Sequence, residues 1–143
     1  MVMVSGMKYK TMKPQRASVG SAGYVICSPD KIRIMPGRWT EIDTGVRLED
    51  TDVCTDFERW FIMLVPISRL SNKYGLKLRN TVDVIDMDYR DTIKVEVTVE
   101  CVPLTLEKGD WFLQAIIMPF GRFENEITPI DIRKDPFGPK GGF

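Results

Sequence analysis

The clearest pattern of hydrophobic and polar positions in the chain is a period of two over residues 93–100. Ile93, Val95, Val97 and Val99 alternate there with lysine, glutamate and threonine. Alternation of this kind places every second side chain on the same face of an extended segment. It therefore predicts a β-strand with one buried face and one face in water.

Two longer segments, residues 60–65 and 111–118, are almost continuously apolar, and each is followed by a proline. Apolar runs of this length, rich in β-branched and aromatic residues, are typical of strands buried on both faces. Residues 107–110, Glu-Lys-Gly-Asp, have the composition of a hairpin turn that leads into the second run. We therefore expect a strand buried on both faces at residues 60–65 and a second apolar strand at residues 111–118.

The rest of the chain has shorter runs of the same kind, separated by turn residues. They lie at residues 22–27, 32–34 and 39–48, the last with Gly45 at a kink or bulge. Residues 71–77 are polar and predict a single helical turn at most, and residues 50–59 predict a loop. No window of twelve or more residues keeps a helical period. Many short strands with regular turn signals predict an all-β sandwich or barrel.

A length of 143 residues is enough for one domain with a substantial core and too short for two. We divide it into three parts. Residues 1–18 are an N-terminal extension with a first strand region, and residues 19–130 are the β domain. Residues 131–143 are a flexible C-terminal arm, because their glycines and prolines do not suit a packed strand.

Acidic and basic residues balance at 20 each, so no overall field attracts nucleic acid or an acidic membrane surface. Recognition of an anion therefore has to come from the local placement of charge. The chain has no histidine, which excludes histidine-based triads, histidine general bases and histidine-ligated zinc.

The three cysteines, Cys27, Cys54 and Cys101, are far apart and odd in number. They predict small buried thiols in a reducing compartment, not a disulfide framework. No apolar run reaches the roughly 18–20 residues that cross a bilayer, and the N-terminus has no export-signal pattern. We expect a cytoplasmic protein, in the host cytoplasm if the chain is of viral or phage origin.

The strongest candidate for chemistry is the segment 80–90, Asn-Thr-Val-Asp-Val-Ile-Asp-Met-Asp-Tyr-Arg. Its β-branched residues predict a strand that enters a tight turn at Val-Ile-Asp. Carboxylates gathered at such a turn are either solvated surface groups or groups that bind a metal or activate a water. The segment alone does not decide between these alternatives.

Five short segments together resemble the motifs of the trimeric dUTPases, the deoxyuridine triphosphate nucleotidohydrolases. In chain order they are residues 21–25, 66–70, 80–90, 109–114 and 140–143. The resemblance covers about residues 17–143, with family-like gaps between the motifs. It implies a distorted jelly-roll β-barrel and a homotrimer whose active sites are each assembled from neighbouring subunits.

The resemblance also implies an activity. A 2′-deoxypyrimidine triphosphate, dUTP by default, would be hydrolysed to the monophosphate and pyrophosphate when an Asp-activated water attacks the α-phosphorus. Mg²⁺ would be held by the triphosphate and waters, with no direct side-chain ligand. The expected partners are the deoxynucleotide and further copies of the chain, with no nucleic acid and no membrane.

In that family's pattern, Asp86 is the general base that orients and activates the water, and Gln114 contacts the phosphates or positions this water. Tyr89 stacks against the deoxyribose and leaves no room for a 2′-hydroxyl. Each residue also has a purely structural interpretation. Asp86 would be a turn-capping or solvated acid, Gln114 an inward polar group on a buried strand, and Tyr89 interstrand packing.

The remaining residues implied by the resemblance bind the base and the phosphates. Asn80 and the backbone of residues 81–85, including Val84 and Ile85, would read the pyrimidine edge, although Asn80 is also a common turn residue. Ser68 would hydrogen-bond the phosphates. On the C-terminal arm, Phe143 would stack on the base, and Lys140 would either add charge near the γ-phosphate or be a solvated tail lysine.

This sequence departs from the family's pattern at four positions. Val25 stands where the first motif has an aspartate, which puts the metal region in question. Ile67 replaces the arginine of the second motif, and Arg69 follows; on a strand the two would share a face, so Arg69 would supply the missing guanidinium. Gly138 stands where the fifth motif has an arginine.

The fourth departure is Asp83, at a position that is usually glycine or alanine. If it points inward, its carboxylate repels the O4 of uracil and favours an exocyclic amine, which predicts the same chemistry on dCTP or a modified pyrimidine. If it points to solvent, which is the simpler expectation, dUTP remains the substrate. A non-catalytic nucleotide-binding or regulatory protein is the third alternative, because two family residues are missing.

Overall fold

The structure is a computed structural model that describes residues 7–9, 12–49 and 59–126. The predicted loop at 50–59 lies almost wholly outside these ranges, and so do Cys54, Lys140, Phe143 and the arm at 131–143.

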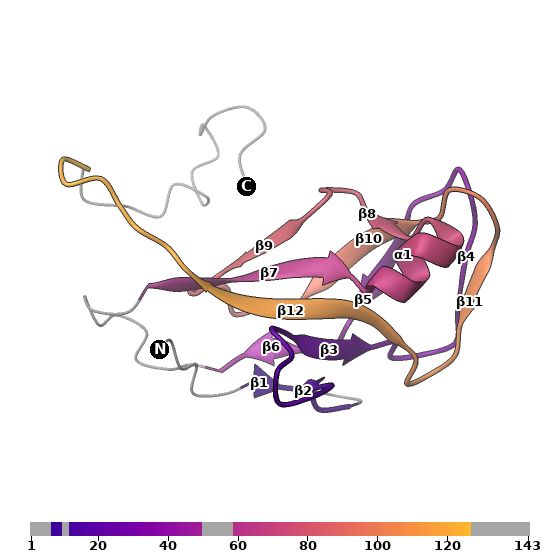
Figure 1. Cartoon of the computed structure of the whole chain (residues 1–143), viewed down its shortest axis with the longest axis horizontal. Helices are drawn as coiled ribbons and strands as arrows, with labels where there is room; N and C mark the ends of the chain where they lie inside the picture. Colours follow the sequence, from indigo (N-terminus) through magenta and orange to yellow (C-terminus); the bar gives the residue numbers. More distant parts are fainter. Residues whose placement is uncertain (1–6, 10–11, 50–58, 127–143) are drawn as a thin grey trace.

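The largest element of the fold is a five-stranded antiparallel sheet built around one long strand (Figure 1). Its order is β2 (Gln15–Arg16), β3 (Tyr24–Cys27), β12 (Trp111–Pro119), β7 (Trp60–Pro66) and β9 (Asp83–Asp86). The partner of β12 along its length is β7, from Leu113↔Pro66 to Pro119↔Trp60. This pairing places the end of β7 beside the first part of β12.

A second antiparallel sheet has the order β5 (Thr40–Asp43), β10 (Lys94–Thr98) and β8 (Lys77–Leu78). Two further antiparallel pairs complete the described fold: β11 (Leu104–Leu106) with β4 (Ile32–Ile34), and β1 (Met7–Lys8) with β6 (Arg47–Leu48). The one helix in the described residues is α1 (Ser68–Tyr74). The architecture is the predicted all-β, jelly-roll-like fold.

A single hydrophobic core joins all these sheets. Ile62 and Phe112 come from the large sheet, Val97 from the second sheet and Ile34 from β4, and none of the four side chains has any exposed surface. Burying a side chain of this size stabilises the fold by about 1.5–3 kcal/mol. No helix in the described ranges is long and apolar enough to cross a membrane.

Most of the predicted strands are confirmed. Residues 93–100 contain β10, where Val95 and Val97 are buried, and residues 39–48 divide into β5 and β6 around Gly45, whose φ is 70°. In β7 the residues alternate between buried and half-buried, so this strand is not buried on both faces as predicted. Cys101 is exposed, which corrects the expectation of a buried thiol.

The helix was the main error of the sequence prediction. We expected at most one turn in residues 71–77, but α1 has seven residues and begins at Ser68. Only Leu70 and Tyr74, four residues apart, pack against the core, so the apolar pattern of the helix is too short to recognise. Gly75 ends the helix in the left-handed conformation, with φ 68° and its N–H donating to the carbonyl of Ser71.

Candidate active site

A cavity with a volume of about 680 Å³ lies beside α1. We call it the α1 cavity. Ser68 and Arg69 of α1, Gln114 of β12 and Val25 of β3 line it together. The structure therefore brings together three of the predicted phosphate-binding residues, along with the valine that stands where the family has an acid.

Local sequence explains why Ser68 and Arg69 reach this cavity. Pro66 is the last residue of β7, and Ile67 is the extended N-cap of α1, with φ −68° and ψ 138°. Arg69 therefore lies in the first turn of a helix, and the expectation that it shares a strand face with Ile67 is wrong. Both residues nevertheless line the α1 cavity, so Arg69 supplies a guanidinium to it by a different route.

Gln114 is placed in the cavity by the close packing of β3 on β12. It pairs in register with Val25 and is half-buried. A side chain at Gly23 would place its Cβ only 2.6 Å from the Cγ of Gln114 and 2.8 Å from the carbonyl oxygen of Ala115. The glycine of the first motif is therefore required for this approach of the two strands.

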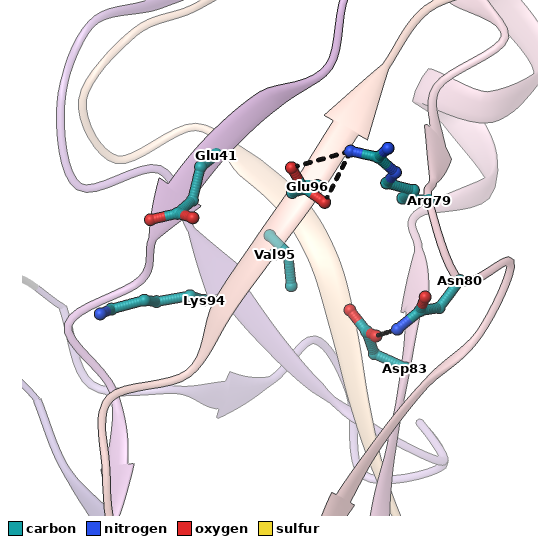
Figure 2. A pocket seen from close by; sticks show the side chains of 7 residues that line it. All are labelled: Glu41, Arg79, Asn80, Asp83, Lys94, Val95 and Glu96. Carbon is teal, nitrogen blue, oxygen red and sulfur yellow. Dashed lines mark hydrogen bonds and ion pairs between the residues drawn. The ribbon is translucent and has the colours of Figure 1, made fainter. Parts of the chain in front are cut away.

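A second, smaller pocket of about 160 Å³ lies between the segment that precedes β9 and the sheet of β5, β10 and β8. We call it the hairpin pocket. Figure 2 shows the seven residues that line it: Glu41, Arg79, Asn80, Asp83, Lys94, Val95 and Glu96. Its volume is well below the ~300–1,000 Å³ of a drug-sized ligand site, so it suits a small ring and not a whole nucleotide.

Asp83 faces into this pocket, which corrects the simpler expectation of a side chain directed to solvent. It is half-buried, and Asn80 donates a hydrogen bond from Nδ2 to its Oδ1 at 2.8 Å. Figure 2 shows the carboxylate directed toward Val95 and the interior of the pocket. On the opposite wall, Arg79 donates from Nη1 to both carboxylate oxygens of Glu96, each at 3.1 Å.

The turn between Asn80 and Asp83 is strained. Thr81 has a φ of 67°, the one positive value at a non-glycine residue in the described ranges. The N–H of Val82 donates to the carbonyl of Asn80 at 2.7 Å, so the chain reverses over three residues around Thr81. A β-branched residue in this conformation is a genuine outlier, and such strain often marks a functional loop.

Asp86 is the last residue of β9, and Tyr89 lies in the turn that follows, as predicted. The N–H of Tyr89 donates to the carbonyl of Asp86 at 3.0 Å, and the Tyr89 hydroxyl donates to the carbonyl of Thr92 at 3.1 Å. Burial is the main cause that raises the pKa of the Tyr89 phenol, and the negative charge of the nearby Asp91 is the second cause. The ring is therefore held in place and stays neutral at physiological pH.

Asp86 occupies the face of β9 opposite to Asp83, because the two are three residues apart on an extended strand. Both Asp86 and Val84 are on that outer face, and Val84 is 58% exposed, whereas Ile85 packs against the core. Neither Asp86 nor Tyr89 lines either of the two pockets. Within one chain, the predicted general base therefore lines neither the α1 cavity nor the hairpin pocket.

Comparison with known proteins decides the family. The sequence model of the dUTPases matches residues 9–141. The chain belongs to the dUTPase family. It is 30% identical over 132 residues to the deoxyuridine 5′-triphosphate nucleotidohydrolase of Leifsonia xyli subsp. xyli, covering 91% of this chain and 82% of that protein.

Solved dUTPase structures have the same fold. The dUTPase of Streptococcus mutans has a TM-score of 0.68 at 23% identity, over 83% of this chain and 98% of that one. A mutant dUTPase from phage phi11 of S. aureus, whose structure reveals the coordination of a structural Mg(II) ion, also has a TM-score of 0.68, at 16% identity over 89% and 99% of the two chains.

The described residues of this chain do not form a side-chain cage for such an ion. No group of three or more Asp, Glu, Cys or His side chains comes together in the part of the chain that the structure describes. Val25, which is 6% exposed, contributes an apolar wall to the α1 cavity. Mg²⁺ carried by phosphate oxygens and waters, an arrangement common for this metal, needs no such cage.

Sequence reasoning missed two features of this dUTPase site. Lys73 lines the α1 cavity with Arg69, and the helical spacing of four residues would have revealed it had α1 been predicted. Arg79, which follows β8, and Glu96 of β10 both wall the hairpin pocket, and only the pairing of β10 with β8 brings them together.

Proposed function

We propose that this dUTPase-family chain hydrolyses dUTP to dUMP and pyrophosphate. The family match over residues 9–141 carries the proposal. The relative from Leifsonia xyli is a deoxyuridine 5′-triphosphate nucleotidohydrolase, and this chain spans 82% of its length. The presence of Asp86, Tyr89 and Gln114 favours an active enzyme over a regulatory protein, because a scaffold does not need this set.

In the proposed reaction, the α1 cavity binds the triphosphate through Ser68, Arg69 and Gln114. Asp86 removes a proton from a water whose oxygen forms a bond to the α-phosphorus. The bond from that phosphorus to the α,β-bridging oxygen breaks, and pyrophosphate leaves with the electron pair. A positioned general base of this kind contributes about 10²–10⁴-fold to the rate.

The charge of the triphosphate has to be neutralised during this attack. Mg²⁺ bound to the phosphate oxygens supplies part of that neutralisation when it is present. Arg69, which follows Ser68 on α1, supplies a further part of this neutralisation from the wall of the α1 cavity.

The base and the sugar would lie at the segment 80–89. Asn80 and the backbone of residues 81–85 read the pyrimidine edge, and the fixed ring of Tyr89 packs against the deoxyribose. On the C-terminal arm, outside the described residues, Phe143 and Lys140 would close over the base and the γ-phosphate. The free thiols of Cys27 and Cys101 are consistent with a reducing cytoplasm as the location.

We also propose a homotrimer with shared sites. The separation of Asp86 from the α1 cavity within one chain supports this, since a second copy would have to bring the two together. Mixing subunits tests it. Asp86→Asn and Arg69→Glu are each expected to be inactive. If sites are shared, co-refolding the two variants in equal amounts restores about a quarter of wild-type activity. In random assembly, about one site in four combines an intact Asp86 from one subunit with an intact Arg69 from its neighbour.

No recovery of activity in the mixture would show that each site belongs to one chain. Sedimentation of the wild-type protein measures the assembly independently. A monomer would also contradict the proposal.

A substrate profile tests the reaction itself. The purified protein is incubated with Mg²⁺ and each deoxynucleoside triphosphate in turn, with UTP as the ribonucleotide control, and pyrophosphate is measured. We expect turnover of dUTP and none of UTP. Absence of turnover with every nucleotide would favour the regulatory alternative.

The orientation of Asp83 favours a second candidate, hydrolysis of dCTP. Its carboxylate faces into the hairpin pocket and accepts a hydrogen bond from Asn80. Cytosine carries an exocyclic amine donor where uracil carries a carbonyl acceptor, so an inward carboxylate favours cytosine. Comparable or faster turnover of dCTP in the same profile would support this candidate, and strict preference for dUTP would exclude it.

A further inference from the structure

The α1 cavity contains a second cation that the family pattern did not lead us to expect. Lys73 lies four residues after Arg69 on α1, and both side chains line the cavity. Residues four apart on a helix are neighbours on the same face. The helix therefore presents an adjacent guanidinium and ammonium to the same space that Ser68 and Gln114 occupy.

The cavity has a local charge that the chain as a whole lacks. Its charged lining consists of Arg69, Lys73 and one acid, Asp110, whereas the complete chain is neutral. Asp110 is already engaged, because its Oδ2 accepts the N–H of Glu107 at 2.8 Å. Among the described residues, neither Arg69 nor Lys73 takes part in an ion pair. The two cations are thus available to a bound anion.

The position of Lys73 is also restrained. Its Nζ lies 5.4 Å from the ring centroid of Tyr74, within the range of a cation–π contact. Tyr74 in turn packs against the core, so the ring is fixed. This contact keeps the ammonium near the cavity wall and reduces the entropy that the long lysine side chain loses when it binds a ligand.

We propose that Lys73 is a phosphate-binding residue that acts with Arg69 on the β- and γ-phosphates of the substrate. The assignment rests on the proposed hydrolysis of a nucleoside triphosphate. Lysine binds phosphate as a point charge and arginine as a two-pronged donor, so the two cations complement each other. Together they provide the positive charge that Ile67 does not provide at the usual position of the second motif.

Loss of the Lys73 charge should weaken the binding of a long phosphate chain and leave the binding of a monophosphate almost unchanged. Lys73→Gln removes the charge but keeps a polar side chain of similar length. We expect its affinity for inorganic tripolyphosphate, measured by calorimetry, to fall about tenfold or more, as is typical for losing a charged hydrogen bond. Affinity for dUMP, which has no β- or γ-phosphate, is expected to stay within about twofold. The KM for dUTP should rise more than kcat falls.

Lys77→Gln is the matched control. Lys77 is an exposed lysine close to α1 in sequence, it pairs with Glu100 at 3.2 Å, and it does not line the cavity. The control is expected to bind tripolyphosphate as the wild type does. Lys73→Arg should restore most of the affinity, because it restores the charge.

Three results would overturn the proposal. These are unchanged tripolyphosphate binding in Lys73→Gln, an equal loss of dUMP and tripolyphosphate affinity, or a wild-type protein that does not bind tripolyphosphate. Failure of the proposed function is a separate result. In that case no nucleotide is hydrolysed, while tripolyphosphate still binds the wild type and binds Lys73→Gln more weakly.

Discussion

The hairpin pocket and the α1 cavity differ in how their charges are satisfied. In the hairpin pocket four of the seven lining residues bind one another: Arg79 pairs with Glu96, and Asn80 with Asp83. In the α1 cavity, Arg69 and Lys73 have no ion-pair partner among the described residues. The first pocket is also about four times smaller, at about 160 Å³ against about 680 Å³.

Under the proposed function, this difference matches each region to one part of the substrate. Cations without an ion-pair partner attract a polyanion and lose little when they bind it, because no existing ion pair has to break. Groups that are already paired give a small pocket directional hydrogen bonds without a large net charge, which suits a neutral base. A neutral chain can therefore bind a nucleotide by dividing its charge between two sites.

The largest effect should come from a residue that belongs to neither pocket. Asp86→Asn is expected to reduce kcat for dUTP about 10³-fold, since the amide cannot accept the proton of the attacking water. Binding of dUMP and tripolyphosphate should stay near wild type, because neither pocket is altered. Near-normal turnover by this variant, measured as pyrophosphate release, would show that the base is another group.

The next largest effect should be confined to the α1 cavity. Arg69→Gln is expected to weaken tripolyphosphate binding about 10–100-fold, the cost of losing a bidentate charged contact. The ratio of dUTP to dCTP turnover should not change, because the hairpin pocket is untouched. Arg122→Gln, at an exposed arginine that pairs with Glu126, is the control. A changed base ratio in Arg69→Gln would contradict the division into two sites.

The sequence predicted the strands well because each carries its own local pattern. The alternation around Val95 and the turn before Trp111 depend only on neighbouring residues, and both are found in the structure. The helix α1 could not be predicted, because two core contacts at Leu70 and Tyr74 stabilise it and they depend on the rest of the fold. Tertiary packing overrides local pattern in such short elements.

The same limit applies to the site. The resemblance indicated Ser68, Arg69 and Gln114, and the fold brings them into one cavity. The direction of Asp83 depends on which face of β9 packs on its neighbours, and that register is not encoded in the motif itself. The place of Lys73 in the cavity depends on α1, so it could not be predicted without the helix.

A smaller effect is expected at Asp83. Asp83→Gly should raise turnover of dUTP relative to dCTP about tenfold, the value of one charge-assisted hydrogen bond to the base. Glu41→Gln removes a different carboxylate from the same pocket, one that is not bound to Asn80, and should change the ratio less. An unchanged ratio in Asp83→Gly would show that the Asn80–Asp83 contact only stabilises the turn, and the hairpin pocket would lose its assigned role in choosing the base.

The smallest effect concerns the strain of the hairpin. Thr81→Gly should raise the free energy of unfolding by about 0.5–1 kcal/mol, because a φ of 67° is unfavourable for threonine and free for glycine, and this gain exceeds the entropy that glycine adds to the unfolded chain. Thr40→Gly, the same change at the first residue of strand β5, should instead destabilise the protein. Denaturant unfolding measures both.

If Thr81→Gly is less stable than wild type, the turn is not strained. If it is more stable but distinguishes dUTP from dCTP less well, then the strain at Thr81 holds the hairpin in the shape that reads the base. The α1 cavity, which recognises charge, shows no such strain, since its one residue with positive φ is Gly109.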